Sequence, residues 1–181
     1  MLVRLVSSTV ILLVMILFTS TGFSGEAPGV GDKAPDFSLP CATKDTLMDA
    51  VKLSDVVGKN NIILAFYPAD WSGGCTKEMC TMRDNFQMLS DLGATVYGIS
   101  GDYVYSHREW AKHHNLQFAL FSDHDHSVAR TYASYNAGTN MNLRTVYVID
   151  RRGIIAYRDL AYKAGSTDSF EKLKEALAKL K

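Results

Sequence analysis

The stretch IILAFYPADWSGGCTKEMC, residues 62–80, places two of the chain's three cysteines five residues apart, after a short apolar run and a glycine-containing turn. Residues 62–67 are apolar and rich in β-formers, which favours a buried strand. Beyond Cys75, apolar side chains recur every three or four residues, which predicts a helix that stops at Gly93. The stretch therefore predicts a strand, a turn and a helix, with Cys75 in or near the first helical turn.

The same alternation continues toward the C-terminus. Strands are predicted at 94–100, 118–122 and 145–150, helices at 105–115, 123–135 and 167–181, and an extended piece at 34–40. A tight turn at 151–153 predicts that the strand at 145–150 pairs with residues 154–160 as a hairpin. Strands that alternate with helices and end in a hairpin predict an α/β fold, with a central mixed β-sheet flanked by helices on both faces.

Length and charge restrict the function. The chain has 181 residues, enough for one domain with a full core. Lys and Arg together number 19, as do Asp and Glu, so no net charge attracts nucleic acid. We therefore expect a globular domain that does not bind nucleic acid.

The N-terminus differs from the rest of the chain. Residues 5–18 form an apolar run after a short basic start, and small and polar residues follow. This order is typical of a secretory signal peptide, which we place at residues 1–24, with an uncleaved membrane anchor as the alternative. A linker is expected at 25–33 and the folded domain at 34–181. The expected location is exported, periplasmic or extracytoplasmic, with a membrane tether if the segment is retained.

The position of Cys75 favours chemistry over architecture. Unsatisfied N–H groups and the positive dipole end at a helix N-terminus stabilise a thiolate. Cys80 lies about 7.5 Å further along the same helix and on a different side. An intact helix cannot hold a disulfide between them, because the Cα atoms of a disulfide lie at most about 6.8 Å apart. A bond that forms only when the helix unwinds fits better. Cys41 is interpreted as a structural or incidental thiol.

Pro68, Ser72 and Cys75 have the Pro-x-x-x-Thr/Ser-x-x-Cys spacing of peroxiredoxins, which are cysteine peroxidases of thioredoxin-like fold. A second cysteine five residues later resembles their bacterioferritin-comigratory-protein, or Q-type, branch. The segments APDFSLP, VYGIS, FSDHDHSVA and LRTVYVIDRRG also occur in the order of that family. The resemblance extends from about residue 31 to the C-terminus.

The resemblance implies a role for five residues. Cys75 would be the peroxidatic nucleophile and Cys80 the resolving thiol, joined in an intramolecular disulfide. Ser72 would hydrogen-bond the thiolate or the peroxide, Pro68 would shield the site from water, and Arg144 would hold the thiolate and polarise the O–O bond. The substrate would be hydrogen peroxide or an organic hydroperoxide, and the reductant a thioredoxin-like protein. The family needs no metal and no organic cofactor, and we expect a monomer or weak dimer.

Two other functions use a similar fold. Exported thiol–disulfide oxidoreductases usually carry Cys-x-x-Cys, whereas four residues separate the cysteines here. Copper-binding assembly factors use Cys-x-x-x-Cys with a distant histidine, where this chain has Arg144. The methionines at 79, 82 and 88 are interpreted as core, and the histidines at 107, 113, 114, 124 and 126 as residues of solvated faces.

Overall fold

The computed structural model describes residues 27–180. Its strands are β1 Ser38–Ala42, β2 Leu47–Lys52, β3 Asn61–Phe66, β4 Ala94–Ser100, β5 Ala119–Ser122, β6 Tyr135–Asn136, β7 Met141–Asn142, β8 Thr145–Ile149 and β9 Ile155–Asp159. Its helices are α1 Leu53–Val56, α2 Gly73–Asp84, α3 Phe86–Asp91, α4 Val104–His113, α5 Ser127–Thr131 and α6 Thr167–Ala178.

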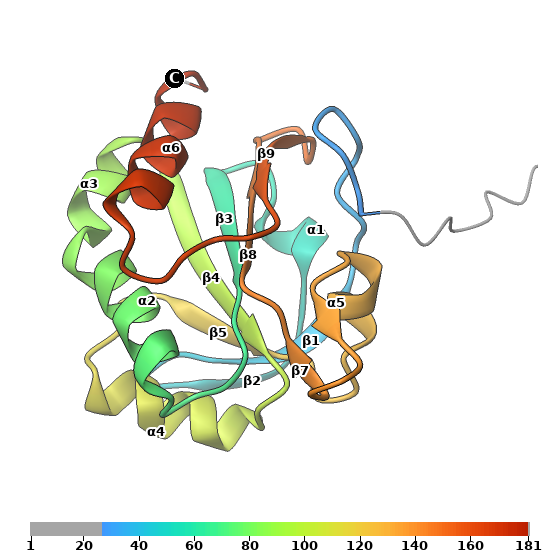
Figure 1. The fold of residues 1–181 in the computed structure, drawn as a ribbon, viewed down its shortest axis with the longest axis vertical. Coiled ribbons are helices and arrows are strands. Elements are labelled where there is room, and N and C mark those ends of the chain that lie inside the picture. The colour runs from blue at the N-terminus through green and yellow to red at the C-terminus, as the bar shows by residue number, and fades with distance from the viewer. Residues whose placement is uncertain (1–26, 181) are drawn as a thin grey trace, which may run out of the picture.

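Seven of the strands form one sheet in the order β2-β1-β5-β4-β3-β8-β9 (Figure 1). Neighbours β3, β4 and β5 run parallel, whereas the β2–β1, β1–β5, β3–β8 and β8–β9 pairs are antiparallel. The sheet is therefore mixed, as predicted, and the last two strands form the predicted hairpin.

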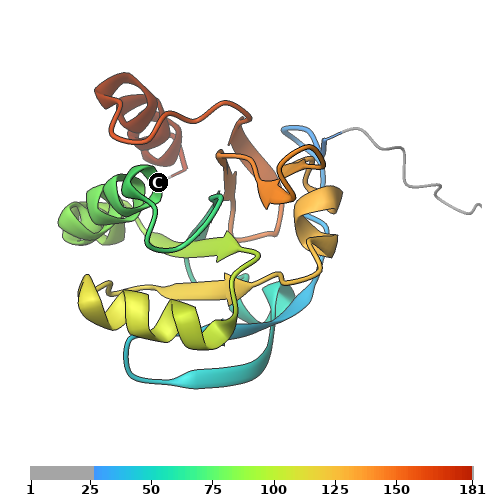
Figure 2. The ribbon, with the colours of Figure 1, turned by 60° about the horizontal axis from the view of Figure 1, so that its bottom comes forward.

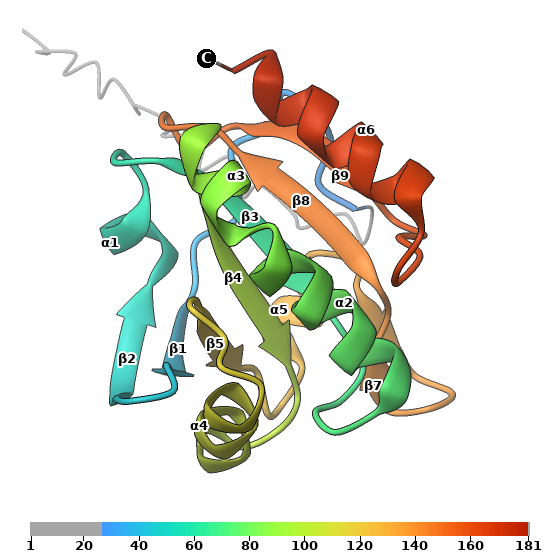
Figure 3. The same ribbon diagram turned by 90° about the vertical axis from the view of Figure 1, so that its left-hand side faces the viewer.

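The core has two halves because helices cover both faces of the sheet. Every residue of β3 is buried, and its side chains alternate between the two halves. Helices α2, α4 and α6 contribute buried side chains to one half, and α1 and α5 contribute to the other. Figure 3 shows α2, α3 and α6 in front of the strands, and Figure 2 shows α4 along β5. Met79 and Met82 are fully buried, as predicted.

The helix predicted after Cys75 is divided at Asn85. The Asn85 side-chain amide donates to the carbonyl of Thr81 at 2.9 Å and so caps the end of α2. A second helix, α3, then continues to Asp91, and Gly93 adopts a positive φ of 72° after it. The apolar spacing is the same in both helices, which is why it predicts a single one.

The helix predicted at 123–135 is shorter, spanning only Ser127–Thr131. His126 before it and Ala133 after it both have left-handed backbone angles, which end a helix. The carboxylate of Asp123 accepts hydrogen bonds from the N–H groups of Val128 and Ala129, in the first turn of α5, at 3.1 and 2.7 Å.

The predicted extended piece at 34–40 overlaps β1, but the second strand of the β1–β2 hairpin was not predicted. Strand β2 lies at the edge of the sheet and has no fully buried residue, so its sequence lacks the apolar pattern that reveals a strand. Residues predicted as linker contact the domain: the Gly31 N–H donates to the carbonyl of Ile155 at 2.8 Å.

The predicted signal peptide or anchor at 1–24 lies outside the described residues. Within 27–180, no helix combines the length and apolar character needed to cross a bilayer.

Candidate active site

The loop between β3 and α2 places Pro68, Ser72 and Cys75 at the N-terminal end of the helix. Ser72 is the N-cap of α2, and its Oγ accepts a hydrogen bond from the N–H of Cys75 at 3.4 Å. The same hydroxyl donates to the carbonyl of Ala69 at 3.2 Å, so it joins the loop to the helix. Pro68 begins the loop and is half-buried. Cys75 is therefore held in the first turn of α2, with its side chain fully buried.

Arg144 approaches this turn from the residue before β8. Its Nη2 donates to the Cys75 sulfur at 3.2 Å, and its Nη1 donates to Oε2 of Glu78 at 2.6 Å. The contact places a permanent positive charge against the sulfur, where it can stabilise negative charge that develops in a reaction. Gly74 leaves room for this contact, because a Cβ there would lie 2.7 Å from Nη2 of Arg144.

Glu78 is a site residue that the sequence did not reveal. Its side chain is fully buried, and its Oε1 has no hydrogen-bond partner among residues 27–180. Burial raises the pKa of Glu78 to about 7, although Arg144 acts in the opposite direction. Charged residues in a helix usually belong to an exposed face. The only sequence signal was its place one turn after Cys75, on the same side of α2.

Cys80 lies on the same continuous helix as Cys75, and both are unpaired thiols. Its side chain is half-buried, and its sulfur lies 3.9 Å from Nδ1 of His114. The structure thus shows the predicted arrangement of two cysteines on one helix without a bond between them.

Cys41 is buried in strand β1, where burial raises its pKa to about 12. That thiol is protonated at neutral pH, which suits the structural role predicted for it.

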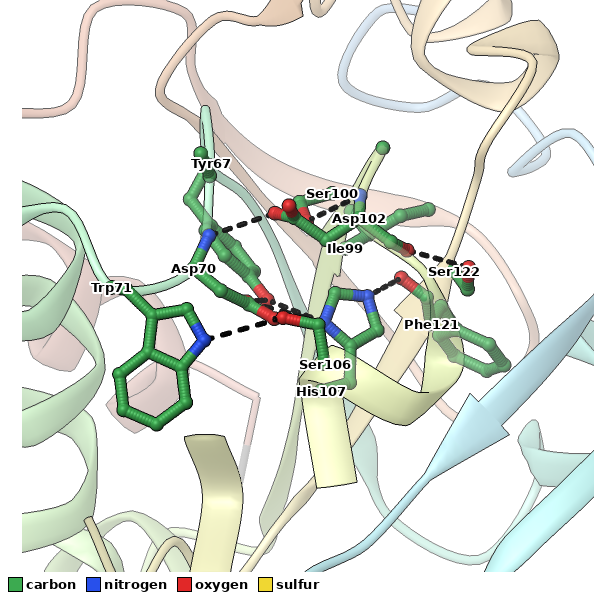
Figure 4. Close-up of polar contacts among 12 residues, drawn as sticks. Tyr67, Asp70, Trp71, Ile99, Ser100, Asp102, Ser106, His107, Phe121 and Ser122 are labelled. Carbon is green, nitrogen blue, oxygen red and sulfur yellow. Dashed lines mark hydrogen bonds and ion pairs between the residues drawn. The ribbon is translucent and has the colours of Figure 1, made fainter. Parts of the chain in front are cut away.

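A buried polar network connects Asp70, in the loop between β3 and α2, to helix α4 (Figure 4). Asp70 contacts Nδ1 of His107 at 2.9 Å and accepts hydrogen bonds from the hydroxyls of Tyr67 and Ser106, each at 2.8 Å. The other ring nitrogen of His107 donates to the carbonyl of Phe121 at 3.1 Å. Both ring nitrogens of His107 thus contact buried oxygen atoms, which joins α4 to the loop before α2.

Two histidines correct the prediction that these residues lie on solvated faces. His107 is fully buried in the network, and His126 is buried with its Nδ1 2.9 Å from Oδ1 of Asn142. The signal for His107 was present, since it lies three and four residues before Trp110 and Ala111, which form the buried face of α4. The prediction gave more weight to the polarity of histidine than to this spacing. Across residues 27–180, no three His, Cys, Asp or Glu side chains are grouped to hold a metal ion.

Comparison with known proteins identifies the family. Residues 30–158 match the AhpC/TSA family. Peroxiredoxin Bcp of Bacillus subtilis is 33% identical over 154 residues, covering 81% of this chain and 95% of the relative. Chloroplastic peroxiredoxin Q of Triticum aestivum is 39% identical over 140 residues, covering 76% of this chain and 62% of the relative. The crystal structure of peroxidoxin BcpB from Mycobacterium tuberculosis superimposes with a TM-score of 0.73 at 25% identity, covering 85% of this chain and 99% of that one.

These relatives contradict the predicted location. The wheat relative is named as a chloroplast protein and the Bacillus relative as a Bcp peroxiredoxin, and neither name refers to export. The prediction of an exported, periplasmic or extracytoplasmic protein is therefore wrong, and the membrane tether is dropped with it. An apolar run of about 14 residues beside small residues is a signal of composition only, and hydrophobicity alone does not specify a destination.

The family match covers more than half of the chain, and the Bacillus relative is 33% identical with 95% of its length covered. The chain therefore belongs to the AhpC/TSA family and is a peroxiredoxin, a thiol-dependent peroxidase of thioredoxin-like fold.

Proposed function

We propose that Cys75 is the peroxidatic nucleophile and that it reduces hydrogen peroxide and organic hydroperoxides. The observation that carries this proposal is the 3.2 Å contact between Nη2 of Arg144 and the Cys75 sulfur. The thiolate attacks one peroxide oxygen, the O–O bond breaks, and Cys75 becomes a sulfenic acid. The departing oxygen develops negative charge, which a guanidinium stabilises without having to lose a proton.

Ser72 and Pro68 have supporting roles in this reaction. The Ser72 hydroxyl caps α2 and holds the Cys75 N–H at 3.4 Å, close to where peroxide must bind. Pro68 is half-buried at the start of the loop and limits the access of water to the sulfur. A buried, partly desolvated site strengthens the electrostatic action of Arg144.

Cys80 then resolves the sulfenic acid as an intramolecular disulfide. The two cysteines lie five residues apart on α2, so the first turns of the helix must unwind for the sulfurs to meet. A thioredoxin-like protein reduces the disulfide and completes the cycle, and we expect the chain to act as a monomer or weak dimer. The Arg144 contact also disfavours the copper-binding alternative, because a cation on the sulfur opposes Cu(I).

Mass spectrometry after one equivalent of peroxide tests the assignment. The unmodified chain should lose two thiols and gain one disulfide between Cys75 and Cys80. The Cys80→Ser variant should stop at a sulfenic acid on Cys75 that dimedone traps. Peroxide turnover by the Cys75→Ser variant would refute the assignment of the nucleophile, and Cys41→Ser serves as the control that should behave like the unmodified chain.

A further inference from the structure

The thiol proposed to resolve the sulfenic acid has a histidine beside it. Helices α2 and α4 lie next to each other at the end of the sheet that carries the active site (Figure 3). His114 is the C-cap residue of α4, and its Nδ1 lies 3.9 Å from the Cys80 sulfur. The side chains of both residues are half-buried. The contact places a nitrogen that can accept a proton against a thiol that must lose one to react.

The surroundings of His114 disfavour the charged form of its imidazole. Burial lowers the pKa of His114, and the neighbouring charges of His113 and Arg83 lower it further. The rings of Trp110 and Trp71 lie 5.8 and 6.3 Å from it, centroid to centroid, and restrict water around it. A neutral imidazole has one ring nitrogen free to accept a hydrogen.

We propose that His114 accepts the proton of the Cys80 thiol when Cys80 resolves the sulfenic acid on Cys75. This role rests on the proposed function, since it presumes that Cys80 is the resolving thiol. The Cys80 proton moves to Nδ1 of His114, and the sulfur lone pair attacks the Cys75 sulfur. The S–S bond forms as the S–O bond of the sulfenic acid breaks, and hydroxide leaves and takes up a proton to become water. Cys80 is oxidised by the sulfenic acid, so no further oxidant is required.

The second half of α2 is positioned so that Cys80 stays beside His114 while the helix unwinds. Nη1 of Arg83, one turn beyond Cys80, donates to the backbone carbonyl of His114 at 2.8 Å. Met82, which also follows Cys80, is fully buried in the core. Unwinding from Gly73 to Met79 is therefore enough to release Cys75, and the part of α2 after Cys80 remains attached to α4.

The charged and titratable groups near His114 are few. Cys80 and Arg83 face it from α2, and His113 precedes it on α4, with its ring centroid at 4.7 Å. Lys44, from the turn between β1 and β2, donates to the side chain of the next residue, Asn115, at 2.8 Å. Arg83 is itself paired with the carboxylate of Asp84, whose Oδ1 lies 2.7 Å from Nη2 of Arg83. The proton that His114 takes up then passes to the departing hydroxide.

The test compares His114→Gln with His124→Gln, an exposed histidine whose Nδ1 lies 3.0 Å from the carbonyl oxygen of Gly101. Stopped-flow tryptophan fluorescence and acid-quenched mass spectrometry separate the oxidation of Cys75 from the formation of the disulfide. An ordinary thiol is about 3% ionised at pH 7, so losing the acceptor should slow disulfide formation by about 10- to 30-fold. The oxidation of Cys75 should keep its rate, and His124→Gln should change neither step.

The pH profile distinguishes a proton acceptor from a residue that only supports the fold. At pH 9.5 most ordinary thiols are ionised without help, so His114→Gln should recover to within about 2-fold of the unmodified chain. A defect of the same size at pH 7 and 9.5, or no defect at either, would overturn the role of His114. If instead dimedone traps no sulfenic acid on Cys75 in any variant, the proposed function itself has failed, and the role of His114 with it.

Discussion

Replacing Glu78 with glutamine should remove a pH-dependent loss of stability. Burial raises the pKa of Glu78 from an ordinary 4.5 to about 7. Between these pH values the folded chain keeps a proton that the unfolded chain has lost, so the free energy of unfolding falls as pH rises. The penalty is absent below about pH 4.5 and complete above about pH 7. Since one pKa unit corresponds to about 1.4 kcal/mol, the penalty reaches about 3 kcal/mol.

Urea unfolding of the reduced protein, followed by tryptophan fluorescence at pH 4.5, 5.5, 6.5 and 8, measures this penalty. Glutamine keeps the shape of the side chain and an oxygen for Arg144, but does not ionise in this range. The free energy of unfolding of Glu78→Gln, relative to the unmodified chain, should therefore rise by about 3 kcal/mol from pH 4.5 to 8. Glu171→Gln, at an exposed position, is the control that should show no such trend. A difference that does not change with pH would refute the reasoning, because it would mean that Arg144 fully offsets the burial of Glu78.

Three further substitutions test the geometry around Cys75. Gly74→Ala should slow the reaction with peroxide by at least about 10-fold in stopped-flow assays, because its Cβ would displace Arg144; Gly73→Ala, with nothing within 4 Å, should not. Ser72→Ala should cost about 1 kcal/mol of stability through loss of the N-cap, whereas Ser72→Thr should largely retain it in urea unfolding. His107→Gln should cost about 1–3 kcal/mol in urea unfolding, because it removes one hydrogen-bond partner of the buried Asp70 while Tyr67 and Ser106 remain; a cost below about 0.5 kcal/mol would show that the His107 contact contributes little.

The parts of the site that the sequence predicted are local along the chain. A strand, a glycine-containing turn and a helix follow one another within residues 62–84, and their signals are short-range. Cys75 could therefore be placed near the first helical turn from the pattern alone, whereas Ser72 was a candidate only through the resemblance to peroxiredoxins, and its place as the N-cap is a finding of the structure. Arg144 is distant in the sequence, and only the resemblance to peroxiredoxins pointed to it.

The parts that escaped prediction depend on contacts between distant segments. Asp70 and His107 are 37 residues apart, and each is polar enough to suggest an exposed position when considered alone. Glu78 has the same difficulty, since only the approach of Arg144 makes its burial tolerable. The shortening of α5 depends on left-handed angles at His126 and Ala133, which non-glycine residues adopt in only a few per cent of cases.

Helix α4 and its C-cap contact the chain on both sides of residues 73–79, the segment that unwinds in the proposed reaction. At its first turn His107 holds Asp70, two residues before the N-cap Ser72, and at its end the His114 carbonyl holds Arg83, three residues after Cys80. Between these two attachments the helix can unwind, but the chain cannot separate from the domain. The entropy lost when Cys75 and Cys80 meet is then the cost of closing a short loop with fixed ends, which is smaller than the cost for a free chain. These two attachments would thus let the proposed disulfide form by local unwinding of α2 while the rest of the domain stays folded.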